Sequence, residues 1–440
     1  MSRARVVWHY ARARRRTFAD RAALVAWQDR HLRRVLRLAP RRYAFYAGTQ
    51  PRALGDLPVV DKADVLARFA DLNVRGVGLD ECLAAARAAE RGRDFGTTLR
   101  GLSVGLSSGT TGRQTAFLTS AAERDRWAGE VLARTLPDGL LAGARVTLVL
   151  RAGGPLYESV DGGRVSFRFV DLALDEERLL DEIRAADPTV LVAPPSVLVA
   201  VARAGLGVHP GRVLSVAEVL DPQDAAVVED GLGVRVDQVY QAAEGFLGAS
   251  CAHGRLHLAE DLVVVEREDA GGGRFVPVVT DLFRSSQAVL RRRVGDVLVP
   301  DDDVCPCGSP MLVVREIVGR SDDVLWLPRR GGVPGDALTV AGGGDVRPVL
   351  GAFHPDFVRA AVLAVPEVDD FRVDQTATDV LRLAVEPATA YDAARRSLEL
   401  ALAGAGLAVP SVVPGVVEPR DPLVKRRRVR RDPAVPAGTR

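Results

Sequence analysis

Residues 101–113 of this 440-residue chain read GLSVGLSSGTTGR, a stretch in which two chemically different motifs overlap. Its first five residues match the G-x-S-x-G pattern that carries the nucleophile of many serine hydrolases, here Ser103. The residues that follow are rich in serine, threonine and glycine, a composition suited to a loop whose backbone N–H groups and hydroxyls hold phosphate. Which of the two motifs is functional decides both the expected fold and the expected chemistry.

The hydrolase interpretation has little support outside the motif itself. A nucleophile elbow places its serine at a strand-to-helix turn and needs an acid and a histidine later in the chain. Residues 99–106 favour a strand that leads into a Gly/Thr loop, and no later histidine has the context of a partner. With 42 glycines in the chain, the pattern also arises by chance. The phosphate loop is therefore preferred, although it is not a Walker loop, since G-x-x-x-x-G-K-[ST] is absent.

The composition indicates an ordinary globular protein, with 47% hydrophobic and 26% charged residues. A net charge of +2 gives no field that would favour nucleic acid. The most apolar run, TVLVAPPSVLVAVA, is too short to span a bilayer, and the Arg-rich N-terminus lacks a secretory signal. Four cysteines argue against a disulfide framework. We expect a cytoplasmic protein with no nucleic-acid or membrane partner.

The order of apolar patterns predicts an α/β fold. The start of the chain, 1–95, reads as helices at Ala19–Leu38, Lys62–Leu72 and Leu79–Arg91. From residue 145, short strands alternate with amphipathic helices, which is typical of a parallel sheet; the strands are Val146–Leu150, Val165–Val170, Thr189–Ala193, Val213–Val216 and Val234–Tyr240, and the helices are Asp175–Ala186, Ser196–Ala204 and Asp221–Asp230.

Residues 255–300 are strand-rich, and a smaller α+β pattern ends the chain. The predicted strands of the first region are Leu262–Glu266, Phe275–Val279 and Val289–Arg293, with a turn at Gly271–Gly273. The later pattern has strands near Ala361–Val365, Leu381–Val385 and Val412–Val417 and a helix at Tyr391–Ala403. We expect a large N-terminal domain, 1–321, with mixed or parallel sheets and helices, and a small mobile C-terminal α+β domain, 322–440.

Three further motifs follow predicted strands or lie near this boundary: YQAAEG at 240–245, RVGD at 293–296 and VGRSDD at 318–323. Lys425, one of only two lysines, lies near the C-terminus. Their order and spacing resemble the adenylate-forming superfamily of acyl-CoA synthetases, adenylation domains and luciferase-like enzymes. The phenylacetate-CoA ligase-like branch is most similar, including relatives of the synthetase that adenylates a deazaflavin coenzyme. The segments that resemble this subgroup are WAGEVL, LVAPPSVL, SVAEVL, YQAAEGFLGASC, GRLHLAEDL and VVTDLFRSSQ. The resemblance covers roughly residues 55–430.

The resemblance implies how ATP would be held. The β- and γ-phosphates would lie in the loop formed by Ser107, Ser108, Gly109, Thr110, Thr111 and Gly112. Ala217 and Glu218 would lie along the adenine, and Tyr240 would stack on its face. Asp296 would accept hydrogen bonds from the ribose hydroxyls. From the residues alone, Tyr240 also fits a core aromatic residue and Asp296 fits a turn cap.

The resemblance also implies the catalytic groups. Glu244 would hold Mg²⁺, which takes oxygen ligands, and Arg320 would lie near the α-phosphate. Lys425 would neutralise charge between carboxylate and α-phosphate, and Asp322 would be the hinge of the small domain. From the residues alone, Arg320 and Asp322 also fit a surface ion pair, and Lys425 heads the run KRRRVRR, usually a solvated strand or tail. Two departures from the superfamily are Arg113-Gln114 in place of Pro-Lys and Val424, in place of glycine, before Lys425.

Three of the four cysteines lie in two short segments that suit a zinc site. Cys251 and His257 form C-x₅-H, and Cys305 and Cys307 form C-x-C in VCPCGSP. Three thiolates and an imidazole are a sufficient set for tetrahedral structural Zn²⁺. We predict such a site within the subregion 250–310, the alternative being a buried or active-site histidine with buried thiols.

These features together predict an ATP- and Mg²⁺-dependent ligase. It would activate a carboxylic acid as an acyl-adenylate and pass the acyl group to a thiol of CoA or a carrier protein, or to an amine. Two alternatives stay open: a nucleotidyl transferase that adenylates a hydroxyl, as the deazaflavin relatives do, and a scaffold that keeps only nucleotide binding.

Overall fold

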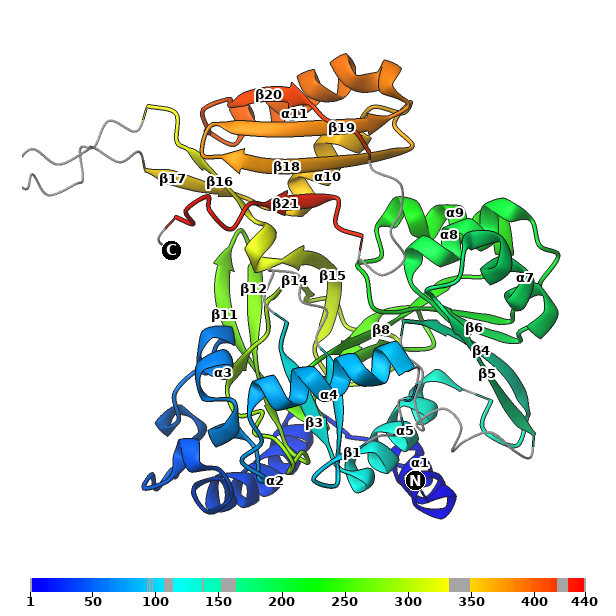
Figure 1. The fold of residues 1–440 in the computed structure, drawn as a ribbon, viewed down its shortest axis with the longest axis vertical. Coiled ribbons are helices and arrows are strands. Elements are labelled where there is room, and N and C mark those ends of the chain that lie inside the picture. The colour runs from blue at the N-terminus through cyan, green and yellow to red at the C-terminus, as the bar shows by residue number, and fades with distance from the viewer. Residues whose placement is uncertain are drawn as a thin grey trace, which may run out of the picture. The chain divides into compact units, whose positions relative to one another are not determined.

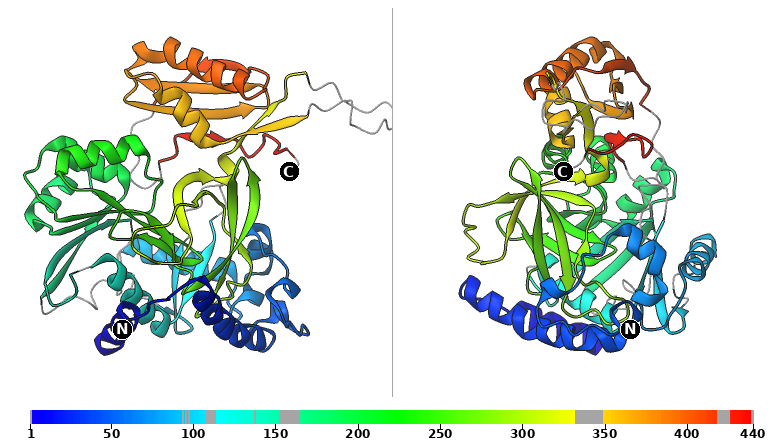
Figure 2. Two further views of the ribbon diagram at one scale, coloured as in Figure 1. Left: turned by 180° about the vertical axis from the view of Figure 1, so that it is seen from behind. Right: turned by 90° about the vertical axis from the view of Figure 1, so that its left-hand side faces the viewer.

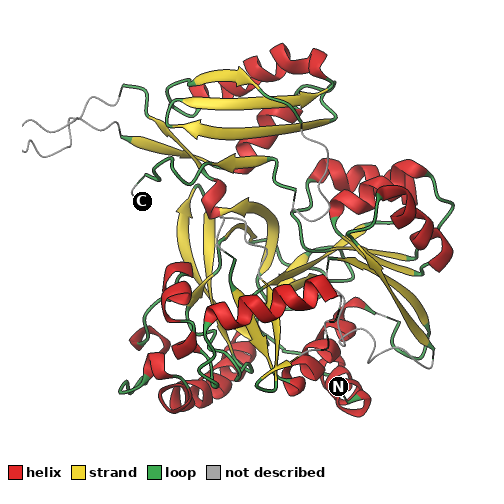
Figure 3. Ribbon diagram, viewed as in Figure 1, coloured by secondary structure: helices red, strands yellow, loops and turns green. Residues whose placement is uncertain are grey.

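The computed structural model describes residues 2–92, 94, 96, 98–106, 114–136, 138–151, 164–331, 349–417 and 426–438 (Figures 1 and 3). Within these, the chain forms two compact units. The first contains the residues up to Val294 together with Leu298–Ile317. The second contains Gly295–Val297 and the described residues from Val318 onward. This division falls slightly before residue 322, and it gives the Gly-Asp pair of the RVGD motif to the second unit.

The first unit begins with helices, as the sequence predicted: α1 (Arg3–Arg14), α2 (Arg21–Arg42), α3 (Lys62–Arg68) and α4 (Leu79–Gly92). Asp20 caps α2 by accepting a 2.8 Å hydrogen bond from the backbone N–H of Ala23. Helix α3 starts with a capping box of Asp61 and Asp64, but it ends at Arg68. The predicted remainder of that helix is a separate 3₁₀ turn, Ala70–Leu72.

The predicted alternation of strands and helices is confirmed as the parallel half of a large sheet. Its strands run in the order β5-β4-β6-β7-β8 and are β4 (Ala144–Leu150), β5 (Val165–Asp171), β6 (Val190–Ala193), β7 (Arg212–Ser215) and β8 (Val236–Ala242). The helices α7 (Glu176–Ala186), α8 (Pro195–Ala204) and α9 (Pro222–Leu232) pack on it (Figure 2). Asp221 and Pro222 start α9 as expected, although the Asp221 side chain makes no capping bond.

Beyond β8 the sheet becomes antiparallel, which the sequence pattern did not resolve. Strand β9 (Gly245–Ser250) pairs antiparallel with β8, and the sheet continues in the order β10, β15, β14, β12, β11, with β13 beside β12. These strands are β10 (Leu256–Leu258), β11 (Val263–Gly271), β12 (Arg274–Asp281), β13 (Arg292–Arg293), β14 (Asp296–Asp301) and β15 (Val313–Arg320). The β11–β12 hairpin turns through three glycines with φ of 82°, 60° and 74°, as the sequence predicted.

The GLSVG stretch lies on a small antiparallel sheet of β1 (Thr98–Leu99), β2 (Leu102–Leu106) and β3 (Ala116–Thr119). Ser103 stands within β2, opposite Thr119, and not at a strand-to-helix turn. Its Oγ is buried and has no hydrogen-bond partner among the described residues. The hydrolase reading of Ser103 is therefore not supported by the backbone.

Helix α5 (Ala121–Thr135) was not expected from the sequence and packs against α1. Ser120 and Glu123 form its capping box. The two helices approach so closely that a Cβ on Gly129 would lie 2.6 Å from His9 Cβ and 2.7 Å from Val6 O. The contact therefore requires glycine at 129.

A buried ionic cluster ties the link between α1 and α2 to the rest of the unit. Arg16 and Arg134 each pair with both Glu130, on α5, and Asp261, before β11. Both acidic side chains are at most 2% exposed. Burial would raise the pKa of Asp261, but the charges of Arg134 and Arg16 hold it below its usual range.

The second unit has its own core. Strand β16 (Leu325–Pro328) pairs with β17 (Leu350–Phe353), and a four-stranded sheet runs in the order β20-β19-β18-β21. Its strands are β18 (Asp370–Ala377), β19 (Val380–Glu386), β20 (Ser411–Pro414) and β21 (Val429–Arg431), and its helices are α10 (Pro355–Leu363) and α11 (Tyr391–Gly404). The predicted α+β character is confirmed.

One prediction for this unit was wrong. Ala361–Val365 was expected to be a strand, but it forms the end of α10, which Pro355 starts and which buries Val358, Ala361 and Val362 at helical spacing. The run after Lys425, for which the sequence left a strand as one alternative, leads into β21, which pairs parallel with β18.

No helix among the described residues is both long and apolar enough to cross a bilayer.

We predict that Arg16→Met will lower the free energy of unfolding by about 3–5 kcal/mol, because it leaves two buried carboxylates with a single guanidinium. Arg15→Met is the matched control, since Arg15 is the exposed neighbour. Urea unfolding followed by tryptophan fluorescence measures both. Equal stability of the two variants would show that the cluster contributes nothing.

Candidate active site

Two of the predicted groups lie outside the described residues: the loop Ser107–Gly112 and Lys425. The strands that flank the loop are described. Leu106 at the end of β2 pairs with Ala116 at the start of β3, so the two ends of the connection are held side by side.

Ala217 and Glu218 follow β7, at the carboxyl end of a parallel strand where such sheets bind ligands. Ala217 has a φ of 69°, and the N–H of Glu218 donates to the carbonyl of Val216 at 2.8 Å, the pattern of a strained γ-turn. The Glu218 carboxylate accepts a 2.8 Å hydrogen bond from the hydroxyl of Ser196, at the start of α8. Sequence reasoning did not identify this role of Ser196, which only the crossing of α8 beside the turn creates.

Tyr240 lies near the end of β8 and is 6% exposed. It belongs to the main apolar cluster of the first unit and pairs in register with Gly248 on β9. The core reading of this residue is thus consistent with its burial, and adenine stacking stays a prediction.

Glu244 stands at the tight connection between β8 and β9. The guanidinium of Arg284 holds this connection by donating to the carbonyls of Ala243 and Glu244, at 2.8 and 3.2 Å. Its other end donates to the carbonyl of Leu118 on β3 and to the side chain of Gln287, both at 3.1 Å. Arg284 therefore fixes the position of Glu244 relative to the strand that leaves the phosphate loop. It was not singled out from the sequence, although it lies in the quoted segment VVTDLFRSSQ.

A small cavity of about 20 Å³ adjoins Glu244. It is lined by residues that follow the predicted loop, including Thr115 and Phe117, and by Gln287 and Arg292. The structure thus brings together Glu244 and the segment beside the loop, which are far apart in the sequence.

Asp296 and Arg320, predicted as ribose and α-phosphate groups, bind each other. Arg320 Nη1 lies 3.0 Å from Asp296 Oδ1, and both belong to the second unit. The guanidinium lies where a Cβ of Gly295 would stand, so this position suits glycine. The sequence had left open an ion pair between Arg320 and Asp322, but the carboxylate that Arg320 contacts here is that of Asp296.

Asp322 lies in a 3₁₀ turn, Ser321–Asp323, just after the division between the two units. The N–H of Ser321 donates to the carbonyl of Gly295 at 2.8 Å, and the buried Asp323 pairs with Arg427. Burial and the charge of Arg320 lower the pKa of Arg427 to about 10, while Asp322 opposes this. The turn is thus tied to the chain segment that follows Lys425.

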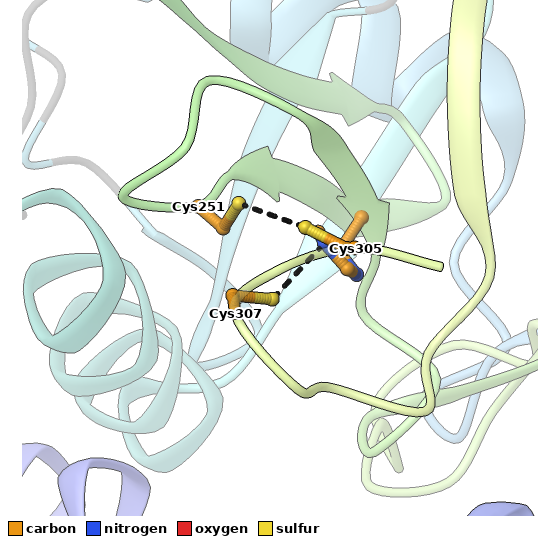
Figure 4. A group of neighbouring side chains, drawn as sticks. Cys251, Cys305 and Cys307 are labelled. Atoms are coloured by element: carbon orange, nitrogen blue, oxygen red, sulfur yellow. Dashed lines mark hydrogen bonds between the residues drawn. The ribbon is translucent and has the colours of Figure 1, made fainter. Parts of the chain in front are cut away.

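The four residues predicted to bind zinc form one cluster, shown in part in Figure 4. Their ligand atoms all lie within 4.8 Å of one another. Cys251 Sγ is 3.6 Å from Cys305 Sγ, and Cys307 Sγ is 3.4 Å from His257 Nε2. A tetrahedron with Zn–S bonds of about 2.3 Å has edges of about 3.8 Å, so the donor set fits this ion.

The surroundings of the cluster also suit a metal. Nδ1 of His257 lies 3.3 Å from the carbonyl of Met311, which leaves Nε2 toward the thiols. Burial lowers the pKa of His257, which favours the neutral imidazole. Burial would raise the pKa of Cys305, but hydrogen bonds from Cys307 and Cys251 outweigh it and lower the value. Burial and the neighbouring thiols raise the pKa of Cys307 to about 11.

The chain as a whole is similar to known proteins at low sequence identity. No protein-family model matches the chain. It is 27% identical over 292 residues to the phenylacetate-coenzyme A ligase of Thermus thermophilus, which is 60% of each chain. The chain therefore matches less than two thirds of that curated relative.

Two solved structures show the same fold at low identity. A 2-hydroxyisobutyryl-CoA ligase in complex with R3-HIB-AMP is 19% identical, with a TM-score of 0.63, over 92% of this chain and 89% of the other. The amide bond synthetase McbA from Marinactinospora thermotolerans is 16% identical, with a TM-score of 0.51, over 74% and 67%. The expected α/β fold with a small C-terminal unit is confirmed. The specific relation to deazaflavin-adenylating enzymes stays a prediction.

We predict that Ala217→Gly will leave the free energy of unfolding unchanged or raise it by up to about 1 kcal/mol. Glycine adopts a positive φ without strain, which offsets its larger entropy in the unfolded chain. Ala225→Gly within α9 is the control and should cost about 1 kcal/mol. Chemical unfolding measures both. An equal loss in the two variants would show that the turn at Ala217 is unstrained.

Proposed function

We propose that this protein is an ATP- and Mg²⁺-dependent ligase that converts a carboxylic acid into an acyl-adenylate and then transfers the acyl group. The observation that carries the proposal is the meeting of Glu244 with Thr115–Phe117 around one polar cavity. Glu244 would hold the magnesium ion, and the residues before Thr115 would hold the phosphates. These two functions must be adjacent, because magnesium bridges phosphate oxygens.

In the first step, a carboxylate oxygen of the acid attacks the α-phosphorus of ATP. The bond from the α-phosphorus to the bridging oxygen of the β-phosphate breaks, and pyrophosphate leaves. Arg320 and Lys425 would stabilise the negative charge on the α-phosphate, and Asp296 would orient the ribose. Such catalysis acts mainly by positioning and electrostatics. Before it can do so, Arg320 would exchange part of its contact with Asp296 for the nucleotide.

In the second step, a thiol or amine attacks the acyl carbonyl, and AMP leaves. The turn at Asp322 would act as the hinge that changes the groups facing the adenylate. CoA is the acceptor we favour, because the curated relative is a phenylacetate-coenzyme A ligase and one similar structure contains 2-HIB-AMP and CoA. Carrier-protein thiols and amines are the other acceptors to test.

Pyrophosphate release and hydroxamate formation across a library of carboxylic acids, with hydroxylamine as trap, test this proposal. We expect both products with the same acid and with a requirement for Mg²⁺. Pyrophosphate release with a hydroxyl compound, and a product heavier by AMP, would identify a nucleotidyl transferase. The absence of pyrophosphate release with every compound would support a nucleotide-binding scaffold.

We predict that Lys425→Ala will reduce pyrophosphate release by about two orders of magnitude, the cost of losing one charge-stabilising donor. The only other lysine, Lys62, begins α3 and provides the matched control Lys62→Ala. Initial rates at saturating ATP measure the effect. Wild-type activity in Lys425→Ala would remove this lysine from the mechanism.

We further propose that Cys251, His257, Cys305 and Cys307 hold a structural zinc ion. The cluster joins the β9–β10 hairpin to the loop between β14 and β15. It presents four protein donors, the number that fills a structural zinc site and leaves no open position for catalysis.

Metal analysis of the purified protein should therefore find about one zinc per chain. The double substitution Cys305→Ser with Cys307→Ser should lose the metal and lower the melting temperature. Cys82→Ala is the control, because Cys82 is a buried thiol on α4 outside the cluster. A metal-free wild type with an unchanged melting temperature in the double variant would refute the zinc site.

A further inference from the structure

Three consecutive arginines enter β13, and among the described residues only the middle one forms no ion pair. Arg291 pairs with Glu266, and Arg293 pairs with Glu268, each through two hydrogen bonds. Arg292, which points to the other side of the chain, is 7% exposed. Its Nε makes no hydrogen bond, and its side chain forms no ion pair with another described residue. The guanidinium of Arg292 is thus buried, and it lacks the two-bond pairing with a described carboxylate that Arg291 and Arg293 have.

This guanidinium faces the cavity beside Glu244. Arg292, Glu244, Gln287 and Thr115 are among the residues that line that cavity. Burial lowers the pKa of Arg292, and the charge of Glu244 only partly opposes this, while the nearby Arg284 adds to it. Two carboxylates, Glu244 and Asp64, lie in range of Arg292, but neither forms an ion pair with it among the described residues. A buried cation that has a second cation beside it and no carboxylate in contact is a site that an incoming anion would stabilise.

The sequence order favours a phosphate oxygen as that anion. The cavity is lined by Thr115–Phe117, which begin three residues after the last residue of the predicted phosphate loop, Gly112. Arginine binds phosphate through two parallel N–H donors, and those of Arg292 are not engaged by a carboxylate.

We propose that Arg292 is an oxyanion-binding residue for the pyrophosphate portion of ATP, on the side of Glu244 that faces β3. This rests on the proposed function, since that function supplies pyrophosphate as the leaving group. With ATP and Mg²⁺ bound, Arg292 and the magnesium ion at Glu244 would together neutralise the negative charge of the phosphates. It would hold the leaving group in place while the bond to the α-phosphorus breaks, and weaker binding there would speed product release.

Direct binding of inorganic pyrophosphate to the full chain, with Mg²⁺ and without any acid, tests this inference independently of catalysis. We expect Arg292→Gln to weaken the affinity measured by calorimetry by about 10- to 100-fold, the scale of a hydrogen bond to a charged group. Arg292→Lys should lose less affinity for pyrophosphate, because lysine keeps the positive charge although it lacks the two parallel N–H donors of arginine. The stabilisation of the protein by pyrophosphate in a thermal melt should shrink in the same order.

Two controls separate binding from folding. Arg267→Gln removes an exposed arginine of β11 and should leave the affinity unchanged. Arg292→Met removes the buried charge without leaving a polar group, so it should fold with wild-type or higher stability and still lose pyrophosphate binding.

Equal pyrophosphate affinity in wild type and Arg292→Gln would overturn the inference, and so would a wild type that binds no pyrophosphate. A further outcome is that Arg292→Gln keeps its pyrophosphate affinity and loses activity only on acids that carry a second carboxylate. That result would show that Arg292 binds the acid substrate and not pyrophosphate, and it would also overturn the inference. Pyrophosphate binding that depends on Arg292, without hydroxamate from any acid, would leave this inference standing and refute the ligase proposal. If hydroxamate forms and pyrophosphate binding does not depend on Arg292, the ligase proposal stands and this inference is refuted.

Discussion

The arrangement of the site depends on the guanidinium of Arg284. Its hydrogen bonds reach two carbonyls of the β8–β9 connection, the carbonyl of Leu118 on β3 and the side chain of Gln287. The first contacts position Glu244, and the last two position the strand that leaves the predicted phosphate loop. A planar group with five donors can join three segments in this way, whereas a lysine could not hold them in one geometry. The distance between the proposed magnesium ligand and the proposed phosphate site is therefore set by one half-buried side chain.

Around this point the protein uses arginine in two distinct ways. In the cluster of Arg16, Arg134, Glu130 and Asp261, each guanidinium is matched by carboxylates, so the charges stabilise a contact between helices and sheet. Arg292 lies equally deep without such a match and lines a cavity instead. Removing one partner from a matched cluster leaves a buried charge without its counter-charge, which is destabilising. Removing an unmatched cation takes an uncompensated buried charge away. Stability measurements on Arg16 and Arg292 variants should therefore change in opposite directions.

The sequence predicted the parallel half of the sheet well, because strands such as Val190–Ala193 are continuous apolar runs between helices with clear 3.6-residue periodicity. It failed where local preference and environment disagree. The segment at 361–365 is rich in alanine and valine and suits either state, and its helical form follows from Pro355 and from burial of one face in the core of the second unit. Helix α5 was missed because seven of its residues are buried, polar ones included, which obscures an amphipathic pattern.

The sequence alone determined the chemical groups and their order: a loop of hydroxyls and glycines, a glutamate after a strand, an Asp and an Arg near a domain boundary, a late lysine, and three thiols with an imidazole. These are local patterns, and residue type and spacing are sufficient to find them. The tertiary structure decided which of them meet: Cys251 and His257 with Cys305 and Cys307, Asp296 with Arg320, and Glu244 with the end of the loop strand. It alone distinguished Arg292 from Arg291 and Arg293, because burial and the position of carboxylates on another strand are properties of the folded sheet and leave no mark on an Arg-Arg-Arg sequence.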